Sequence, residues 1–292
     1  MLWLYDLPTP LLAALLLALS MAYALGTVLL VRKMKWQLSP EDNGTAAALH
    51  AFVGVMYAVA LGLLVVNAQE DYNDVDHAVV NEANATGNLY RVLAGLEPPN
   101  RDRLQRDVQQ YATLVLTDEW PRARHGGHSE PTFRAVDRLA AGIYTYQPAT
   151  PREERVYPQM VGAVGMILEA RQQRVYLGAR GVGMVTWTIV ILGGLITVGF
   201  SAFFWMQNGR AQVILTSLMA AVYGLMLTLL VSTDHPMWGN VAVDQEPFAQ
   251  LRAEWMRLHQ QGMGPPVPHA EPPRRRGRDG ARPPPPPPKK MR

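Results

Sequence analysis

The 292-residue sequence contains no cysteine, and this absence excludes three kinds of chemistry at once. Without thiols, the chain forms no disulfide, carries no thiolate nucleophile and offers no thiolate ligand to a metal. Charged residues are also missing from long parts of the sequence: several stretches contain no Asp, Glu, Lys or Arg. Such stretches indicate a membrane protein, although the mean hydropathy of the whole chain is close to zero.

Four apolar runs are long enough to cross a bilayer, since a helix needs about twenty residues to span the hydrocarbon core. They follow an N-terminal segment (1–10) and occupy residues 11–31, 46–66, 182–205 and 213–231. The first run is no signal peptide, because no basic segment precedes it and Arg32, Lys33 and Lys35 follow it as a stop-transfer flank does. We therefore expect an all-α membrane protein with four transmembrane helices in two hairpins.

Residues 67–181 separate the second and third apolar runs and contain no spanning segment. Apolar residues at spacings of three and four predict a long helical soluble section here. Breaks are expected at Pro98-Pro99 and at the turn over 147–151. The last helix of the section, 153–180, is expected to continue directly into the third membrane helix.

The segment after the fourth run divides into two parts. Residues 232–261 form an exit segment and a short amphipathic helix, with Phe248, Leu251, Trp255 and Leu258 on one face. Residues 262–292 are rich in Pro and Arg and are predicted to be a disordered, solvated tail, a role we favour over a tether to lipid headgroups or a proline-binding module. The net charge of +3 is concentrated in this tail, so it does not imply nucleic-acid binding.

Two histidine- or carboxylate-containing motifs resemble metal sites but lack essential ligands. In the stretch 71–82, Val75 and Asp76 stand where an EF-hand needs an oxygen ligand and a glycine. The sequence HGGH places His125 and His128 close together, without a third ligand, and is interpreted as a polar loop tip. We expect no metal site and no cofactor.

No nucleophile-elbow or Walker pattern is present, so no catalytic residue is assigned and the protein is not expected to be an enzyme. The glycines of 178–183 precede a membrane helix instead of following a strand, so they favour helix packing over phosphate binding. Charge-free spans also argue against a proton relay or an ion-coupled transporter. Small residues at three positions of the second span and three of the third permit close approach of helices, namely Gly54, Ala58 and Gly62, and Gly193, Gly194 and Gly199.

Three stretches, in this order between and after the spans, resemble the bestrophin-like domain family, formerly a bacterial domain of unknown function. They are NAQEDYNDVDHAVVNEANATGNLYR after the second run, ILEARQQR before the third and STDHPMWGNVAVDQEPF after the fourth. The resemblance covers about residues 11–258. It implies a distant relation to bestrophins, which are pentameric ion channels with both termini and the section between spans two and three in the cytosol.

The resemblance further implies a homo-oligomer, a pentamer in bestrophins, in the bilayer of the bacterial inner membrane, with inorganic ions as the transported species. In bestrophins the second helix lines a hydrophobic neck, and the corresponding helix here is charge-free and apolar, as a dewetting constriction requires. With Asp71-Tyr72 as the anchor for the register, the expected neck residues are Val55, Val59, Gly62 and Val66. A register shifted by one residue presents Gly54, Tyr57 and Leu61 instead.

Four carboxylates follow the expected neck, namely Glu70, Asp71, Asp74 and Asp76. Repeated around an oligomer, they form a negative ring at the inner mouth that attracts cations and repels anions. An equally good interpretation is that they form an ordinary solvated helix face.

The fourth run ends in Asp234, Pro236, Trp238 and Gly239, an exit motif that we interpret as the point where the helix leaves the bilayer. Calcium-controlled bestrophins carry a dense acidic clasp at the matching place. Here the carboxylates are spread apart, so no calcium clasp is expected.

The resemblance places Arg32, Lys33 and Lys35 outside, against the positive-inside rule, whereas Arg171, Arg174 and the basic tail inside agree with it. We favour the orientation of the family. The main alternative function is a membrane-anchored sensory or scaffolding protein with a helical soluble domain and no conductance. A membrane enzyme or transporter is a more remote alternative.

Overall fold

The computed structural model describes residues 4–5, 7–262 and 267. The described part of the chain is helical and contains no strand. The predicted disordered tail, 262–292, lies almost wholly outside the described residues. The longer helices are α1 (Thr9–Met34), α2 (Asn43–Val92), α3 (Asn100–Leu114), α5 (Glu130–Tyr144), α6 (Pro151–Gly178), α7 (Met184–Phe200), α8 (Gly209–Asp234) and α9 (Glu246–Gln260). Shorter pieces are η2 (Leu93–Gly95), η3 (Val115–Glu119, a π-helical turn), α4 (Trp120–Ala123), η4 (Ser201–Phe203) and η5 (Gly239–Val241).

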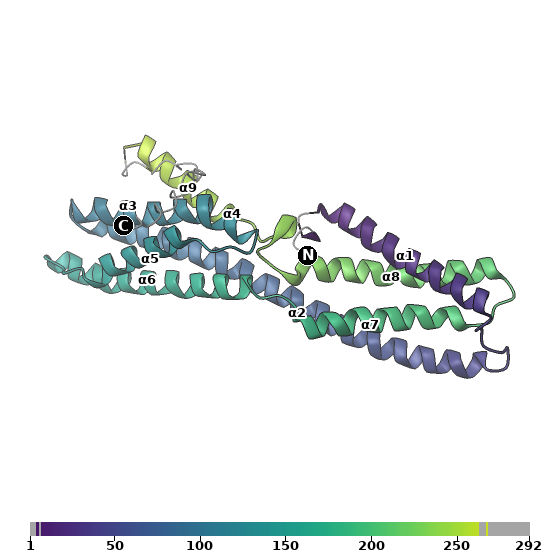
Figure 1. Cartoon of the computed structure of the whole chain (residues 1–292). Coiled ribbons are helices and arrows are strands. Elements are labelled where there is room, and N and C mark those ends of the chain that lie inside the picture. The colour runs from purple at the N-terminus through teal and green to yellow at the C-terminus, as the bar shows by residue number, and fades with distance from the viewer. Residues whose placement is uncertain (1–3, 6, 263–266, 268–292) are drawn as a thin grey trace, which may run out of the picture.

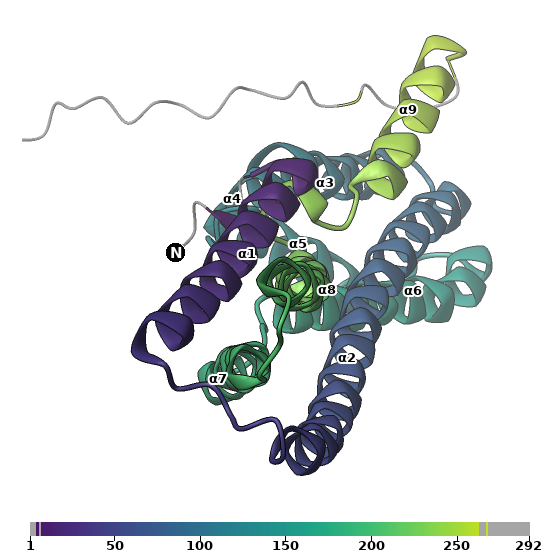
Figure 2. The ribbon, with the colours of Figure 1, turned by 90° about the vertical axis from the view of Figure 1, so that its right-hand side faces the viewer.

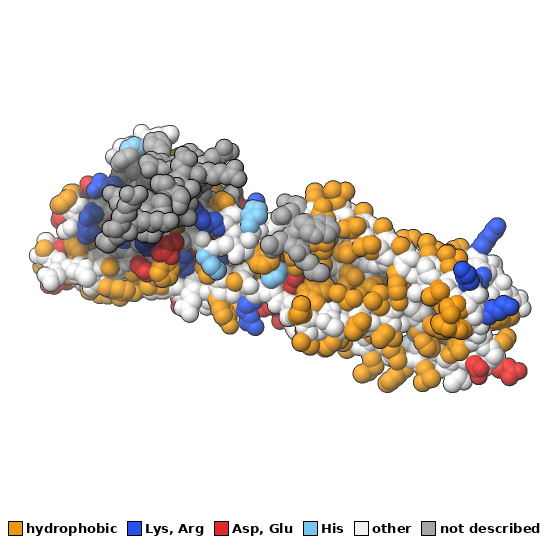
Figure 3. Space-filling view, in the orientation of Figure 1, with side chains coloured by type: hydrophobic (Ala, Val, Ile, Leu, Met, Phe, Trp, Pro, Cys, Tyr) orange, Lys and Arg blue, Asp and Glu red, His pale blue; other side chains and the backbone are white. Residues whose placement is uncertain are grey.

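The molecule is elongated and has two halves, which α2 connects (Figure 1). One half contains α1, α7, α8 and the first part of α2, which are the four helices long and apolar enough to cross a membrane. Apolar side chains cover most of the face of this half that Figure 3 shows. The other half is a bundle of α3, α5, α6, α9 and the second part of α2. The four candidate spans agree in number with the sequence-based expectation, and the boundaries of the soluble section stay a prediction.

Two features differ from the sequence-based expectation. The helix that contains the second expected span does not end near Val66, because α2 runs without a break for 50 residues into the second half of the molecule. Conversely, the helix before the third span does not run into it, because α6 ends at Gly178 and α7 begins at Met184. Three glycines lie in or beside this break, and two of them pack against the exit motif, as described below.

The membrane helices do not pack in the order of their connections. α1 packs along α8, and α8 lies between α1 and α2 when the membrane half is viewed end-on (Figure 2). α2 packs along α6 in the soluble half and contacts α7 and α8 in the membrane half. The two-hairpin arrangement therefore stays a prediction.

Glycines allow tyrosine rings to enter the membrane half. The ring of Tyr57 on α2 occupies the space that a Cβ at Gly193 would need, and the ring of Tyr223 on α8 does the same at Gly194. Both hydroxyls reach the carbonyl oxygen of Val190, at 2.7 Å from Tyr57 and 3.3 Å from Tyr223. A backbone carbonyl of α7 thus accepts the two hydroxyl groups, which lowers the cost of burying them away from water.

The soluble bundle has an apolar core with a charged cluster inside it. Fully buried residues such as Leu89, Leu104 and Ile143 form the core, and α9 inserts Phe248 and Trp255 from the face that the sequence predicts as apolar. Burial of such side chains contributes roughly 1.5–3 kcal/mol each. This core holds α9 on the bundle.

The charged cluster joins α2, α6 and the π-helical turn. Arg174, which is 1% exposed, donates from Nε to Glu82 Oε2 at 2.6 Å and from Nη2 to Glu119 Oε2 at 3.2 Å. Arg171 binds Glu119 through two nitrogens, at 2.6 and 2.8 Å, and the Tyr111 hydroxyl donates to Glu82. Burial alone would raise the pKa of Glu119, but Arg174 and Arg171 outweigh it and lower that pKa. Two guanidinium groups thus balance two carboxylates.

Substitution of Arg174 by Met is expected to destabilise the soluble half strongly. It would leave Glu82 buried with only the Tyr111 hydroxyl, and breaking one partner of a buried ion pair costs about 3–5 kcal/mol. The thermal unfolding midpoint of the purified protein in detergent, followed by tryptophan fluorescence, measures the effect. Arg155→Met, at an exposed position of the same helix, is the control. Equal midpoints for the two variants would contradict the role given to Arg174.

Candidate functional site

The membrane half of α2 presents an apolar face that the chain itself does not cover. The expected neck residues lie on it: Val55, Val59 and Val66 are 64%, 59% and 52% exposed, and Gly62 has open space around the position of a Cβ. Only 6% of the most apolar window of this helix is buried, against 22–33% in the other three spans. Lipid or another copy of the chain has to cover this face.

The alternative register of the neck uses residues that face inward. Leu61 is 7% exposed and packs with Val190 and Leu230, and Tyr57 packs on Gly193 of α7. Gly54 is only partly exposed. The face with Tyr57 and Leu61 is therefore engaged within the subunit, whereas the face with Val59 and Val66 is free.

The four expected inner-mouth carboxylates are all exposed on α2, below the apolar face. A helix turns by about 100° per residue, so Glu70 continues the line of Val59 and Val66. Asp74 and Asp76 lie on the two flanks of this line, about 80° to either side of Val66, and Asp71 lies further round the helix. The same line continues through exposed polar side chains into the soluble half: Asn73, His77, Asn84 and Asn88.

The exit motif is a packed junction between the two halves. Asp234 is 4% exposed and accepts three hydrogen bonds, from the Tyr5 hydroxyl (2.5 Å), the Val182 N–H (2.5 Å) and Trp187 Nε1–H (3.3 Å). It thus ties the N-terminal segment and the start of α7 to the end of α8. Burial and the bond to Asp234 raise the pKa of Tyr5 above its usual value.

Aromatic stacking extends the junction beyond Asp234. The rings of His235 and Trp238 stack with centroids 3.8 Å apart, and the Tyr5 ring meets both edge-on. Burial lowers the pKa of His235, and the nearby Asp234 opposes this effect. Gly239 has a φ of 68°, and a Cβ there would clash with the Tyr5 carbonyl. Pro236, where α8 has ended, accepts the Val243 N–H at 2.8 Å and closes the loop.

Two glycines at the break between α6 and α7 leave room for side chains of the exit segment. A Cβ at Gly178 would clash with Met237, and one at Gly181 with the ring of His235, whereas Gly183 has open space. The break between the two helices thus lets the exit motif pack against the backbone.

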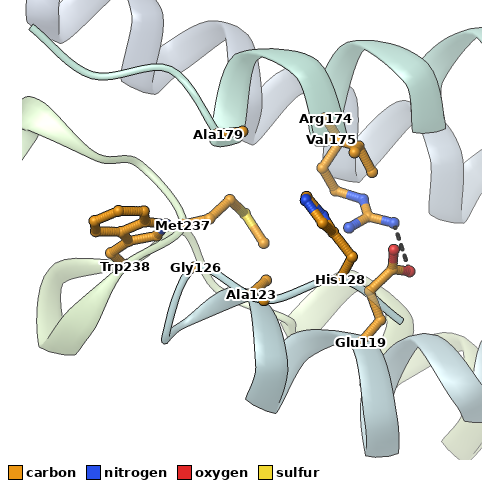
Figure 4. Close-up of a pocket in the computed structure, with 11 residues that line it drawn as sticks. Glu119, Ala123, Gly126, His128, Arg174, Val175, Ala179, Met237 and Trp238 are labelled. Carbon is orange, nitrogen blue, oxygen red and sulfur yellow. Dashed lines mark hydrogen bonds and ion pairs between the residues drawn. The ribbon is translucent and has the colours of Figure 1, made fainter. Parts of the chain in front are cut away.

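A cavity of about 160 Å³ lies beside the junction (Figure 4). Its wall combines the HGGH loop, the end of α6 and the exit motif. The His128 ring and the Arg174 guanidinium face each other at one end, above Glu119, and Met237 and Trp238 lie at the other end. His125 does not line the cavity and instead contacts the Pro121 carbonyl at 3.0 Å. The two histidines of the motif therefore have different environments.

No group of three or more His, Asp or Glu residues within the described ranges could hold a metal ion. The stretch 71–82 is continuous helix rather than a loop, and its last member, Glu82, pairs with Arg174. Asp244 and Glu246 lie at the start of α9, where the Glu246 N–H donates to Asp244 Oδ1 at 3.1 Å.

Comparison with known proteins identifies the fold. The family model named bestrophin-like domain matches residues 9–248, which is most of the chain. The chain belongs to the bestrophin-like family. The order of spans and the exit motif of this bestrophin-like protein fit the resemblance noted in the sequence.

Solved bestrophin homologues share this fold. A variant of a bacterial bestrophin homologue from Klebsiella pneumoniae has a TM-score of 0.67 and 11% identity, covering 85% of this chain and 98% of its own. Another structure of a Klebsiella pneumoniae homologue gives 0.64 and 13%, covering 86% and 99%. A structure described as a membrane protein gives 0.64 and 11%, covering 84% and 98%. No curated protein matches the sequence.

The sequence-based interpretation of this bestrophin-like protein did not predict two of the interactions described here. The pairing of Glu82 with Arg174 joins positions 92 residues apart, and the bond of Tyr5 to Asp234 joins positions 229 apart. Neither spacing follows a local pattern.

Gly181→Ala is expected to loosen the junction, because the new methyl group would meet the His235 ring. Overpacking of this kind costs about 1–3 kcal/mol. Gly183→Ala, two residues further along, enters open space and should leave stability within about 0.5 kcal/mol of the original. Thermal unfolding in detergent distinguishes the two. A Gly183→Ala variant as unstable as Gly181→Ala would show that the His235 contact is not the cause.

Proposed function

We propose that this bestrophin-like membrane protein is a homo-oligomeric ion channel of the bacterial inner membrane, with its neck formed by α2. The observation that carries the proposal is the uncovered apolar face of α2 at Val55, Val59, Gly62 and Val66. A ring of such faces around an axis makes a constriction that excludes water unless it is opened. The inward packing of Tyr57 and Leu61 supports this register over the one shifted by a residue.

The carboxylates below the neck make the proposed inner mouth favour cations. Of the four carboxylates, Glu70 lies nearest the line of the neck. Asp74 and Asp76 lie on either side of that line and widen the negative ring, and Asp71 lies furthest from it. Repeated charges of one sign at a narrow opening concentrate counterions and repel ions of the same sign. The Asn side chains that continue the line offer neutral amide dipoles to an ion that passes further inward.

The proposed orientation has both ends of the chain and the soluble bundle in the cytoplasm. The Tyr5 bond to Asp234 supports a common side for the N-terminal segment, the exit motif and the bundle. Five copies are proposed from the similarity to bestrophins. Determining the mass of the protein in detergent tests the number of subunits. A monomer would contradict a neck formed between subunits.

Ion flux into liposomes that contain the purified protein tests the channel directly. A cation gradient should drive flux that empty liposomes lack. No flux under any gradient, from a folded oligomer, would contradict the channel and favour a scaffolding protein without conductance.

Val59→Ser is expected to increase flux. A hydroxyl in each copy of the neck wets the constriction, and a barrier lowered by about 1.4 kcal/mol raises the rate about tenfold. Val53→Ser makes the same change on another face of the same helix, about 120° away, and should leave flux nearly unchanged. Equal effects at the two positions would place the neck on a different face of α2.

Glu70→Gln is expected to reduce the preference for cations, since it removes a charge on the line of the neck. Asp71→Asn removes a charge further round the helix and should have a smaller effect. The reversal potential of a planar bilayer under a KCl gradient measures both. A larger shift for Asp71→Asn than for Glu70→Gln would contradict the proposed line.

A further inference from the structure

The HGGH loop has no role in the proposed ion path, yet it forms one wall of the cavity in Figure 4. Gly126, with a φ of 72°, turns the chain so that the loop lies against the Trp238 ring. His128 then faces the cavity, opposite the end of α6. The cavity has a volume of about 160 Å³.

The polar end of the cavity has hydrogen-bond donors to spare. Arg174 uses Nε and Nη2 for Glu82 and Glu119, which leaves Nη1 without a hydrogen-bond partner among the described residues. The His128 ring likewise makes no hydrogen bond within the described part of the chain. Glu119 also lines the cavity, but both its oxygens already accept bonds from Arg171 and Arg174, so its charge is compensated. The unused N–H groups of Arg174 suit a ligand group that accepts hydrogen bonds.

The rest of the wall is apolar. Ala123, Val175 and Met237 contribute apolar side chains to the wall, and Met237 and the Trp238 ring lie at the end away from Arg174. Such a wall suits a short hydrocarbon or aromatic body. Charge-assisted hydrogen bonds from guanidinium and imidazole suit a carboxylate head.

We propose that this cavity binds a small organic monocarboxylate, with its carboxylate between Arg174 and His128 and its apolar body against Met237 and Trp238. The ligand would lie on the exit motif, where the end of α8 joins the soluble bundle. The site is thus placed to stabilise one arrangement of this junction. The proposed binding of a monocarboxylate is independent of the proposal that the protein conducts ions.

Binding of 4-fluorobenzoate to the full-length protein in lipid nanodiscs, followed by ¹⁹F NMR, tests the proposal. Saturable binding above that of empty nanodiscs is expected. His128→Ala should weaken it about tenfold or more, because a hydrogen bond to a charged group is lost. His125→Ala, in the same loop but outside the cavity, is the matched control and should bind as the original does.

Two further measurements separate this site from others. Ala179→Leu, at an exposed residue of the cavity wall, should fill the space and abolish binding without lowering the unfolding midpoint. The neutral analogue 4-fluorobenzamide should bind more weakly than the carboxylate. The proposal is overturned by absence of saturable binding, by equal affinities in His128→Ala and His125→Ala, by binding that survives Ala179→Leu, or by tighter binding of the amide.

Discussion

The single unbroken helix α2 belongs to both the membrane half and the helical bundle, and the other helices of both halves pack around it. Its 50 residues span about 75 Å, more than twice the thickness of a hydrocarbon core. The first part is apolar on nearly all sides and contacts its own chain sparingly. The second part is amphipathic, with a buried face from Val75 to Tyr90 against α6 and the rest of the bundle. No loop separates the two parts, so they cannot rotate independently.

The remaining connections between the halves meet at the junction around Asp234. There the N-terminal segment, the link from α6 to α7 and the exit from α8 converge on one buried carboxylate and one stack of aromatic rings. An ionised carboxylate that loses water needs donors in return, and a hydroxyl, a backbone N–H and an indole N–H supply them. The glycines at Gly178, Gly181 and Gly239 permit this packing because they leave room for neighbouring side chains or backbone. Because three segments of the chain bind to one another at this junction, their movement relative to each other is restricted.

The sequence contained enough information for the membrane spans and for α9, because hydrophobic length and amphipathic spacing are local properties. It also predicted that glycines of the third span admit close packing, and the rings of Tyr57 and Tyr223 occupy that space. The continuity of α2 was harder to predict, since the acidic stretch after Val66 resembles a helix end. The buried cluster of Glu82, Arg171 and Arg174 could not be predicted at all, because charged residues in an amphipathic helix are usually solvated. Only the packing of α2 on α6 brings these charges together.

This cluster has a consequence for the opposite end of α2. The pairing of Glu82 with Arg174 fixes the rotation of α2 about its own axis, because turning the helix would separate buried charges. Val66 precedes Glu82 by sixteen residues, and at about 100° per residue it lies almost opposite on the helix surface. Burial of Glu82 toward α6 therefore turns Val66, and with it Val59, away from the chain's own helices. A charge pair in the second half, together with the apolar core around it, thus helps to set which side chains of α2 the membrane half presents to its surroundings.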